Sequence, residues 1–244
     1  MKIYNYFSPN FDKKIRSKRS VKVIVVHYTG MQSERESIKR LCNPKSKVSS
    51  HFLINRKGKV YRLVREKHIA WHAGKSCWGK FDKLNRNSIG IELVNKGHKF
   101  GYINYKKKQL LSLIKVCKIL IKKYKIKKRN IVGHSDISPS RKKDPGEKFP
   151  WKMLAEKNIG IWHKFDNKLL INLRGVKIFK KRDKKKFYDN LKKIGYCLEN
   201  KNRSISIDLI KAFQRHYRQD LINGILDKEC LVIAEFIRKI LKNS

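Results

Sequence analysis

The chain has 244 residues, of which 40% are hydrophobic, and its 62 Lys and Arg against 19 Asp and Glu give a formal net charge of +43. This length suits two domains, and the apolar content excludes a chain that is disordered throughout. The lysines are spread over the whole length without a nucleic-acid-binding motif. We therefore expect no specific nucleic-acid partner, and keep a basic nucleic-acid-binding protein as an alternative. No stretch approaches ~18 uninterrupted apolar residues, so we expect no transmembrane segment.

The five cysteines are widely spaced and include no C-x-x-C pair. This pattern predicts free thiols in the core or at the surface, and neither a disulfide framework nor a cysteine-only zinc site. The N-terminus has no apolar stretch of the signal-peptide type and no lipobox-like cysteine, so we expect nothing that visibly exports the chain.

The N-terminal part of the sequence predicts strands separated by short polar segments. Residues 21–29 form a β-branched run that is apolar at nearly every position, which indicates a strand buried on both faces in the middle of a sheet. A short polar helix is expected around residues 34–41. A hairpin over residues 50–64 follows, with Gly58 in its turn, and a further strand is expected at residues 88–95.

The following part predicts a long helix and one more strand. Apolar residues recur every three or four positions from 105 to 124, which is typical of an amphipathic helix with lysines on its other face. A short strand at residues 130–134 runs into a loop rich in Pro, Gly, Ser and Asp. Residues 1–165 are therefore expected to form an α/β (α+β) domain with a central mixed sheet flanked by helices.

The C-terminal part has a different pattern. Residues 166–186 are mostly charged and are expected to form a linker. Apolar stripes within 187–194, 207–217 and 231–241 predict three helices, and hence a small all-α domain over residues 187–244. A bundle of this size buries little apolar surface, so it should pack on another part of the protein.

Three potential metal ligands lie where strands end or in a constrained loop. His27 ends the first long strand, His134 ends a later one, and Asp144 follows in the Pro- and Gly-rich loop. Two imidazoles and one carboxylate can hold a zinc ion with an open position, where a bound water has a pKa of ~7. The three residues form no local pattern, and by composition alone either histidine is more often a core or surface residue than a ligand.

Several segments of the chain together resemble one known family. They read VIVVHYTG, SSHFLINRKGKVYRLV, AWHAG, NSIGIELVN and IVGHSDISPSRKKDPGEKFPW, and they cover about residues 20–160. They resemble the N-acetylmuramoyl-L-alanine amidases of the zinc amidase-2 family, whose fold is shared with peptidoglycan recognition proteins. The block HSDISPSRKKDPG is specific, because it holds a histidine, a lysine and an aspartate in the order and spacing that the family uses around its metal.

The resemblance implies a set of roles for individual residues. It implies that His27, His134 and Asp144 bind one zinc ion per chain. It also implies that Glu92 is the general base and that Lys142 faces the substrate carbonyl. Glu92 is flanked by apolar residues in a strand, so its side chain points away from theirs, either to solvent or into a cleft.

Other residues are weaker candidates for substrate contact. Some relatives with this fold use a tyrosine where this chain reads Ser-Ser-His at residues 49–51, which leaves Glu92 as the better base. His51, His72 and Trp71 could line the cleft and contact sugar or peptide. Either histidine could equally be structural, and Trp71 could equally serve packing.

The reaction that the resemblance implies is hydrolysis of the amide bond between N-acetylmuramic (or anhydro-muramic) acid and L-alanine in peptidoglycan or muropeptides. The C-terminal segments LKKIGY, LIKAFQRHYR and LINGILDKE resemble the small peptidoglycan-binding domain of cell-wall hydrolases. We expect a monomer whose partners are peptidoglycan or muropeptides. The resemblance implies the cell envelope or periplasm, whereas the absence of a visible signal peptide leaves a cytoplasmic location open. A non-catalytic peptidoglycan recognition module is the other alternative.

Overall fold

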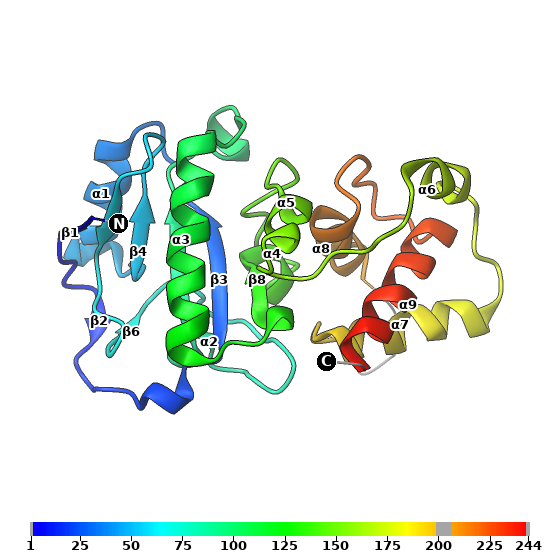
Figure 1. The fold of residues 1–244 in the computed structure, drawn as a ribbon, viewed down its shortest axis with the longest axis horizontal. Helices are drawn as coiled ribbons and strands as arrows, with labels where there is room; N and C mark the ends of the chain where they lie inside the picture. The colour runs from blue at the N-terminus through cyan, green and yellow to red at the C-terminus, as the bar shows by residue number, and fades with distance from the viewer. Residues whose placement is uncertain (1, 199–205, 243–244) are drawn as a thin grey trace.

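The computed structural model describes residues 2–198 and 206–242. Its centre is a six-stranded mixed sheet with the order β1-β5-β4-β7-β3-β8 (Figure 1). These strands are β1 (Ile3–Asn5), β3 (Val23–Tyr28), β4 (Phe52–Ile54), β5 (Val60–Arg62), β7 (Ser88–Leu93) and β8 (Ile131–Gly133). A second, small sheet pairs β2 (Phe11–Asp12) with β6 (Ile69–Ala70). The mixed α/β architecture expected from the sequence is confirmed.

Strand β3 lies inside the sheet, as its apolar run predicts. It pairs in parallel with β7 on one side and with β8 on the other. The predicted hairpin is formed by the antiparallel pair β4 and β5, with Gly58 at φ 84° in the turn. Because β3, β7 and β8 all run in the same direction, their carboxyl ends meet at one edge of the sheet.

The helix α3 (Lys107–Tyr124) covers one face of the sheet (Figure 1). Successive residues of a strand point to opposite faces, so Ile24 and Val26 of β3 pack in the core cluster on the α3 side. Val23 and Val25 point to the other face and belong to a second cluster. That second face is the one from which His27 also extends.

Four of the remaining described α-helices lie after residue 165, and we call residues 166–198 and 206–242 the C-terminal helical region. The remaining described α-helices are α1 (Glu34–Cys42), α2 (Leu84–Asn87), α4 (His134–Ile137), α5 (Trp151–Glu156) and then the C-terminal helices α6 (Asn167–Leu173), α7 (Lys181–Ile194), α8 (Ile207–Tyr217) and α9 (Lys228–Lys242). Helices α1, α3, α8 and α9 and the second half of α7 match predicted helices. Across the described ranges, no helix is both long enough and apolar enough to cross a lipid bilayer.

Residues 166–186, which were expected to form a linker, contain α6 and the beginning of α7. The side chain of Asp166 caps α6 by accepting a hydrogen bond from the N–H of Lys168, and Leu170 is buried. The charged first residues of α7 lie on its solvent side, and Phe187 supplies its first buried contact. Residues 199–205 and 243–244 of the expected domain 187–244 lie outside the described ranges.

The C-terminal helical region packs on the part of the chain that carries the sheet, as its small size predicts. Val23 and Val132 of the sheet belong to the same cluster of buried side chains as Phe187, Phe213 and Ile233 of the helices. This cluster gives the two parts one continuous core on the second face of the sheet. The division into two domains stays a prediction.

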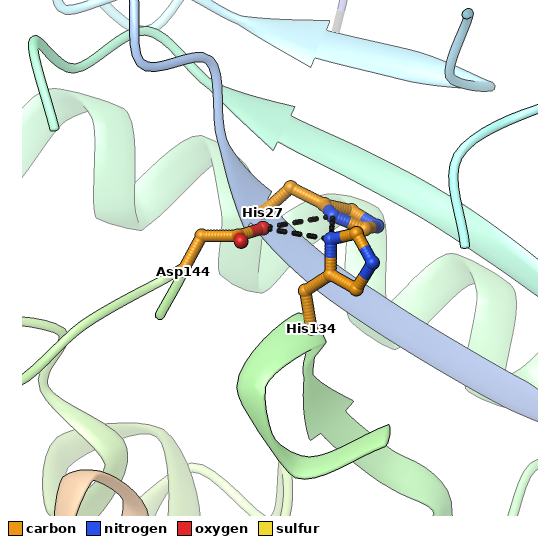
Figure 2. A group of neighbouring side chains, drawn as sticks. All are labelled: His27, His134 and Asp144. Atoms are coloured by element: carbon orange, nitrogen blue, oxygen red, sulfur yellow. Dashed lines mark hydrogen bonds and ion pairs between the residues drawn. The ribbon is translucent and has the colours of Figure 1, made fainter. Parts of the chain in front are cut away.

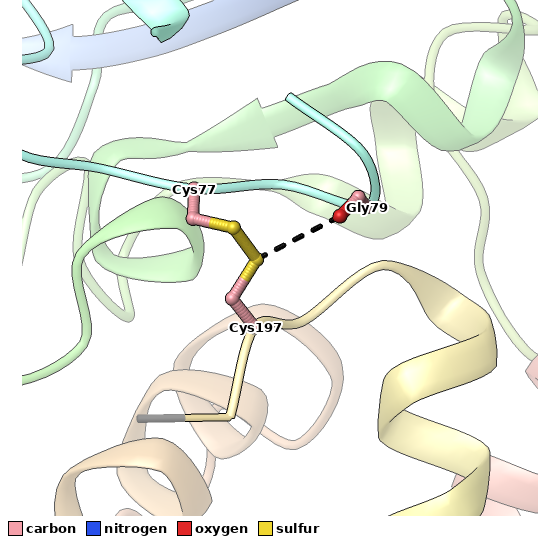
Figure 3. Close-up of a disulfide and its surroundings, with 3 residues drawn as sticks. All are labelled: Cys77, Gly79 and Cys197. Carbon is pink, nitrogen blue, oxygen red and sulfur yellow. Dashed lines mark hydrogen bonds between the residues drawn. A yellow bond between two sulfur atoms is a disulfide. The ribbon is translucent and has the colours of Figure 1, made fainter. Parts of the chain in front are cut away.

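A disulfide between Cys77 and Cys197 joins the helical region to a loop beside the sheet (Figure 3). The expectation that all five cysteines are free thiols is therefore wrong. The two residues are 120 positions apart in the sequence, and packing of the two parts brings their Cα atoms to 5.9 Å. No local spacing marks such a pair. Cys42, Cys117 and Cys230 are free.

Candidate metal centre and active site

The three residues expected as metal ligands converge at the carboxyl edge of the parallel strands (Figure 2). The Nδ1 atoms of His27 and His134 are 2.9 Å apart. The Oδ2 atom of Asp144 lies 3.0 Å from Nδ1 of His27 and 3.1 Å from Nδ1 of His134. All three residues are buried.

The backbone explains why these distant residues meet. His27 is near the end of β3, and His134 directly follows the neighbouring strand β8. His134 is the first residue of α4, whereas the sequence suggested that it ends the strand. The N–H of Ser135 donates to the carbonyl oxygen of Asp144 at 2.8 Å, which holds the Asp144 loop against α4.

The contacts of His134 indicate which of its nitrogens carries the proton. Its Nε2 lies 3.2 Å from the carbonyl oxygen of Ala73. A carbonyl oxygen can only accept a hydrogen bond, so Nε2 is protonated and donates. In the neutral ring, Nδ1 then presents a lone pair toward His27 and Asp144.

A chain of hydrogen bonds gives the same result for His27. The Ser88 hydroxyl donates to the carbonyl oxygen of Leu84, so its oxygen accepts from Nε2 of His72 at 3.1 Å. Nδ1 of the neutral His72 ring must then accept from Nε2 of His27, at 3.0 Å. Nδ1 of His27 is left with a lone pair. Gly90 leaves room for this arrangement, since a Cβ atom there would lie 2.5 Å from the His72 ring.

The electrostatics agree with these protonation states. Burial and the neighbouring His134 lower the pKa of His27 to about 4, so its ring is neutral near pH 7. Burial opposes ionisation of Asp144, but its close contact with His134 and His27 outweighs burial and holds the pKa of Asp144 below its usual range. Two lone pairs and a carboxylate oxygen thus face one another without an intervening proton.

Such a donor set fits a bound cation, and its chemistry fits zinc. Zinc bonds of ~2.0–2.2 Å in a tetrahedral site place neighbouring ligand atoms roughly 3.3 Å apart. The observed separations of 2.9, 3.0 and 3.1 Å are within a few tenths of an ångström of that value. His27, His134 and Asp144 therefore form a possible metal site with room for a further ligand.

Glu92 lies beside this site on β7. It is the register partner of His27 in the parallel β3–β7 pair, so both side chains leave the same face of the sheet. Its Oε2 is buried and has no hydrogen-bond partner within the described part of the chain. Burial and the negative charge of Asp144 raise the pKa of Glu92 to about 8, against the opposing effect of the Lys142 ammonium.

A cleft of about 450 Å³ opens over these residues. It is lined by the three candidate ligands, by Glu92 and Lys142, and by two of the three expected substrate contacts, Trp71 and His72. Further aromatic and basic side chains of the lining are Tyr28, His98, Arg40, Lys99, Arg141 and Lys143. Of the three expected candidates for substrate contact, Trp71 and His72 line the cleft and His51 does not.

His51 is fully buried and does not line the cleft, which supports the structural one of the two roles left open for it. Its ring lies between the backbone N–H of Gly90 and the guanidinium of Arg16, at 3.1 and 2.8 Å. His72 lies in the cleft wall and also supports His27. Trp71 lies in the wall with its Nε1 donating to Asp12 at 2.8 Å.

Sequence reasoning missed Tyr28 and His98. The Tyr28 hydroxyl is 2.7 Å from Nδ1 of His98, and Nε2 of His98 is 3.1 Å from a carboxylate oxygen of Glu147. The only available signal was the position of Tyr28 next to the candidate ligand His27. His98 comes from a separate loop, and no pattern connects it to the site.

Comparison with known proteins gives a consistent result. The family model described as N-acetylmuramoyl-L-alanine amidase matches residues 17–147. The chain is 37% identical over 228 residues to the N-acetylmuramoyl-L-alanine amidase AmiD of Escherichia coli, covering 88% of this chain and 81% of AmiD. It is 34% identical over 163 residues to the 1,6-anhydro-N-acetylmuramyl-L-alanine amidase AmpD of Haemophilus influenzae, covering 59% of this chain and 86% of AmpD.

Solved structures are similar over nearly the whole chain. The structure of Escherichia coli AmiD in complex with the substrate anhydro-N-acetylmuramic acid-L-Ala-D-gamma-Glu-L-Lys has a TM-score of 0.78 at 32% identity, covering 94% of this chain and 92% of AmiD. AmpDh3 of Pseudomonas aeruginosa in complex with anhydromuramic pentapeptide has a TM-score of 0.78 at 29% identity, covering 95% and 96%. With the family match spanning the residues that carry the possible metal site, the chain belongs to the zinc-dependent N-acetylmuramoyl-L-alanine amidase family.

Proposed function

We propose that this chain hydrolyses the amide bond between N-acetylmuramic or anhydro-muramic acid and L-alanine in peptidoglycan or muropeptides. The observation that carries the proposal is a carboxylate oxygen of Glu92 that has no hydrogen-bond partner among residues 2–198 and 206–242 and lies in the same cleft as the His27, His134 and Asp144 cluster. An open metal site next to a carboxyl group that can take and return a proton is an arrangement that hydrolyses amides.

His27, His134 and Asp144 would hold one zinc ion per chain. When bound, zinc supplies Lewis acidity toward a water molecule and the substrate carbonyl. The residues themselves fix the geometry: Ala73 orients His134, and His72 orients His27 through the hydrogen bonds described above. Such partners keep the lone pairs of both rings directed at one point.

Glu92 is the proposed general base and then the general acid. During hydrolysis, a water oxygen adds to the carbonyl carbon and the C–N bond breaks. Glu92 takes a proton from the water and returns it to the departing nitrogen, so L-alanine leaves with a free amine. A carboxyl group whose pKa is raised to about 8 holds a proton near neutral pH more readily than an exposed glutamate does.

Lys142 is proposed to stabilise the negative charge that develops on the carbonyl oxygen. It lines the cleft with Glu92, and its charge already influences the pKa of that carboxyl group. A fixed cation in a cleft that excludes part of the water stabilises such charge more strongly than a cation in bulk water does. Arg40, Lys99 and Lys143 on the cleft wall suit the carboxylates of an acidic stem peptide. Trp71 offers an aromatic surface to the sugar.

The ligands of the similar structures support this substrate class. AmiD and AmpDh3 were each solved with an anhydro-muramic peptide. Because both similarities cover more than nine tenths of this chain, they include most of its C-terminal helical region. We propose that this region contributes to binding the cell wall and that the chain acts as a monomer.

We further propose that the chain works in the cell envelope. The Cys77–Cys197 disulfide supports this location, because disulfides persist in oxidising compartments such as the periplasm and are rare where thiols are kept reduced. Labelling free thiols under denaturing, non-reducing conditions, in protein taken directly from its source cells, tests the proposal. Two blocked and three reactive cysteines are expected, whereas five reactive cysteines would contradict it.

The decisive experiment is mass spectrometry of the products formed from defined muropeptides by zinc-loaded protein. Release of intact free peptide together with an intact sugar is expected, and it should stop in the Glu92→Gln variant. Binding of muropeptide without any product would instead favour a non-catalytic recognition module. DNA binding that weakens steeply with salt, without muropeptide binding, would favour the nucleic-acid alternative.

A further inference from the structure

Asp136 lies two residues after the candidate ligand His134, and both of its carboxylate oxygens accept hydrogen bonds. Oδ2 accepts from the backbone N–H of Gly133 and from Nδ1 of His216, each at 2.7 Å. Oδ1 accepts from the hydroxyl of Tyr196 at 2.7 Å. Tyr196 and His216 belong to the C-terminal helical region, so two of the three donors come from outside the sheet and its loops.

The donors are themselves held in place. The His216 ring stacks on Trp151 of α5, with centroids 3.9 Å apart and planes 10° apart. The Tyr196 ring packs edge-on against Trp78 at 5.0 Å. Asp136, Tyr196 and His216 are all at most 2% exposed, so solvent does not compete for these bonds. The network joins α4 to α5, to α8 and to the segment after α7.

Helix α4 depends on such support because it has only four residues. A single turn of helix is not stable by itself, since nucleation costs more than its few backbone hydrogen bonds return. Asp136 ties the third residue of this turn back to Gly133 at its start. The same carboxylate ties the turn to the helical region. The orientation of His134, at the first position of α4, follows from both bonds.

The Asp144 loop is coupled to the same turn. A Cβ atom at Gly133 would lie 2.5 Å from Cδ of Pro145, so the ring of Pro145 packs directly on the backbone of Gly133. The N–H of Ser135 donates to the carbonyl oxygen of Asp144. A shift of α4 would therefore displace His134 and Asp144 relative to His27, which sits on the rigid sheet.

We infer that Asp136, held by Tyr196 and His216, is a positioning residue for the metal centre. The C-terminal helical region is thus part of the catalytic unit, in addition to any role in binding the cell wall. The inference rests on the proposed metal site. Residues that orient a metal ligand through hydrogen bonds typically account for about 10–100-fold in metal affinity.

Zinc affinity of the full-length protein, measured by competition with a chromophoric chelator, tests the inference without any substrate. Asp136→Asn and Tyr196→Phe are expected to weaken zinc binding by about 10-fold or more, and to change the visible absorption of the cobalt-substituted protein, which reports the geometry of the ligands. The Tyr196→Phe change removes only a hydroxyl, so it keeps the packing on Trp78 and serves if the aspartate variant does not fold.

Two matched variants separate positioning from loss of stability. Tyr61→Phe removes a hydroxyl that donates to the carboxylate of Glu34 at 2.6 Å, far along the sheet. Ile233→Val removes a buried methyl group from α9 without touching Asp136. Both should keep the parent's zinc affinity. The inference is overturned if Tyr196→Phe binds zinc like the parent, or if Ile233→Val weakens binding as much as Tyr196→Phe does. If the zinc affinities of parent and variants are as expected but the parent has no amidase activity, the proposed function is contradicted and the inference about Asp136 is not.

Discussion

His27 and Glu92 are register partners in adjacent parallel strands, with β3 carrying one and β7 the other. The sheet therefore fixes the spacing between a candidate metal ligand and the candidate base through backbone hydrogen bonds instead of through flexible loops. His134 and Asp144 approach from the side of α4 and its following loop. The site thus has a rigid half on the sheet and a half whose position depends on packing.

Replacing Glu92 by Gln should lower kcat by ~10²–10⁴-fold, because the amide cannot accept or return a proton while its size is nearly unchanged. Zinc should remain bound. Initial rates measured beside metal content check this. Glu156→Gln, at the exposed end of α5, is the matched control and should keep the parent's rate. A Glu92→Gln protein that loses its zinc would make Glu92 a ligand.

Removing the metal should abolish turnover without unfolding the chain, because the candidate ligands extend from a sheet with its own apolar core. A chelator should act reversibly, with circular dichroism unchanged and activity restored by added zinc. Asp144→Ala should weaken zinc binding itself, since it removes the anionic ligand. Activity that persists in protein verified to contain no metal would contradict the proposed mechanism.

Replacing Lys142 by Met should lower kcat with little change in muropeptide affinity, because the ammonium acts on charge that develops only in the transition state. The loss of one such group typically costs about 10²–10³-fold. Lys143→Met removes the neighbouring cation of the same cleft and serves as the control. Equal losses in both variants would indicate that the cleft uses its overall charge and no specific oxyanion contact.

Breaking the Cys77–Cys197 disulfide should lower the free energy of unfolding. It closes a loop of 120 residues, and the chain-entropy model gives roughly 5 kcal/mol for a loop of that length, with about 2–4 kcal/mol typical of measured disulfides. Urea unfolding of Cys77→Ser/Cys197→Ser beside Cys42→Ser, which removes a free thiol, measures the difference. An oxidised parent no more stable than the double variant would show that the cross-link contributes nothing.

His163 should make the protein less stable in mild acid. Burial lowers its pKa to about 4, whereas the unfolded chain has a value of ~6.5. Between these values the unfolded state binds a proton that the folded state does not, so the free energy of unfolding falls as pH falls from about 6.5 to 4.

His163→Gln keeps a donor for the carbonyl oxygen of Tyr217 and does not titrate. Its unfolding free energy should therefore fall less steeply in that window, by up to about 1.4 kcal/mol per pH unit. Urea unfolding at a series of pH values measures the slope. Above pH 7 the difference in unfolding free energy between variant and parent should not depend on pH. If the two plots of unfolding free energy against pH are parallel over the whole range, the pH dependence does not come from His163.

The parts of the fold that depend on local pattern could be predicted from the residues alone. The continuous apolar run of β3 and the three- and four-residue spacing of α3 identify elements whose buried side can be read directly from the residues. Alternation along β7 was enough to direct Glu92 away from Ile91 and Leu93. The resemblance, carried by the segments around His27 and His134, then named the residues that the structure brings together.

Which distant elements cover which face of the sheet depends on the packing of the whole chain. The pairing of Cys77 with Cys197 and the contacts of Asp136 with Tyr196 and His216 join segments separated by many residues, and no periodicity encodes such contacts. The charged run at 166–186 contains the beginning of α7, whose narrow buried stripe starts only at Phe187, so charge hid this helical turn from local pattern. His51 is buried and His98 lines the cleft because the packing of whole elements sets the exposure of each side chain. Local pattern specifies which side of an element avoids water, and the packed chain alone specifies what covers that side.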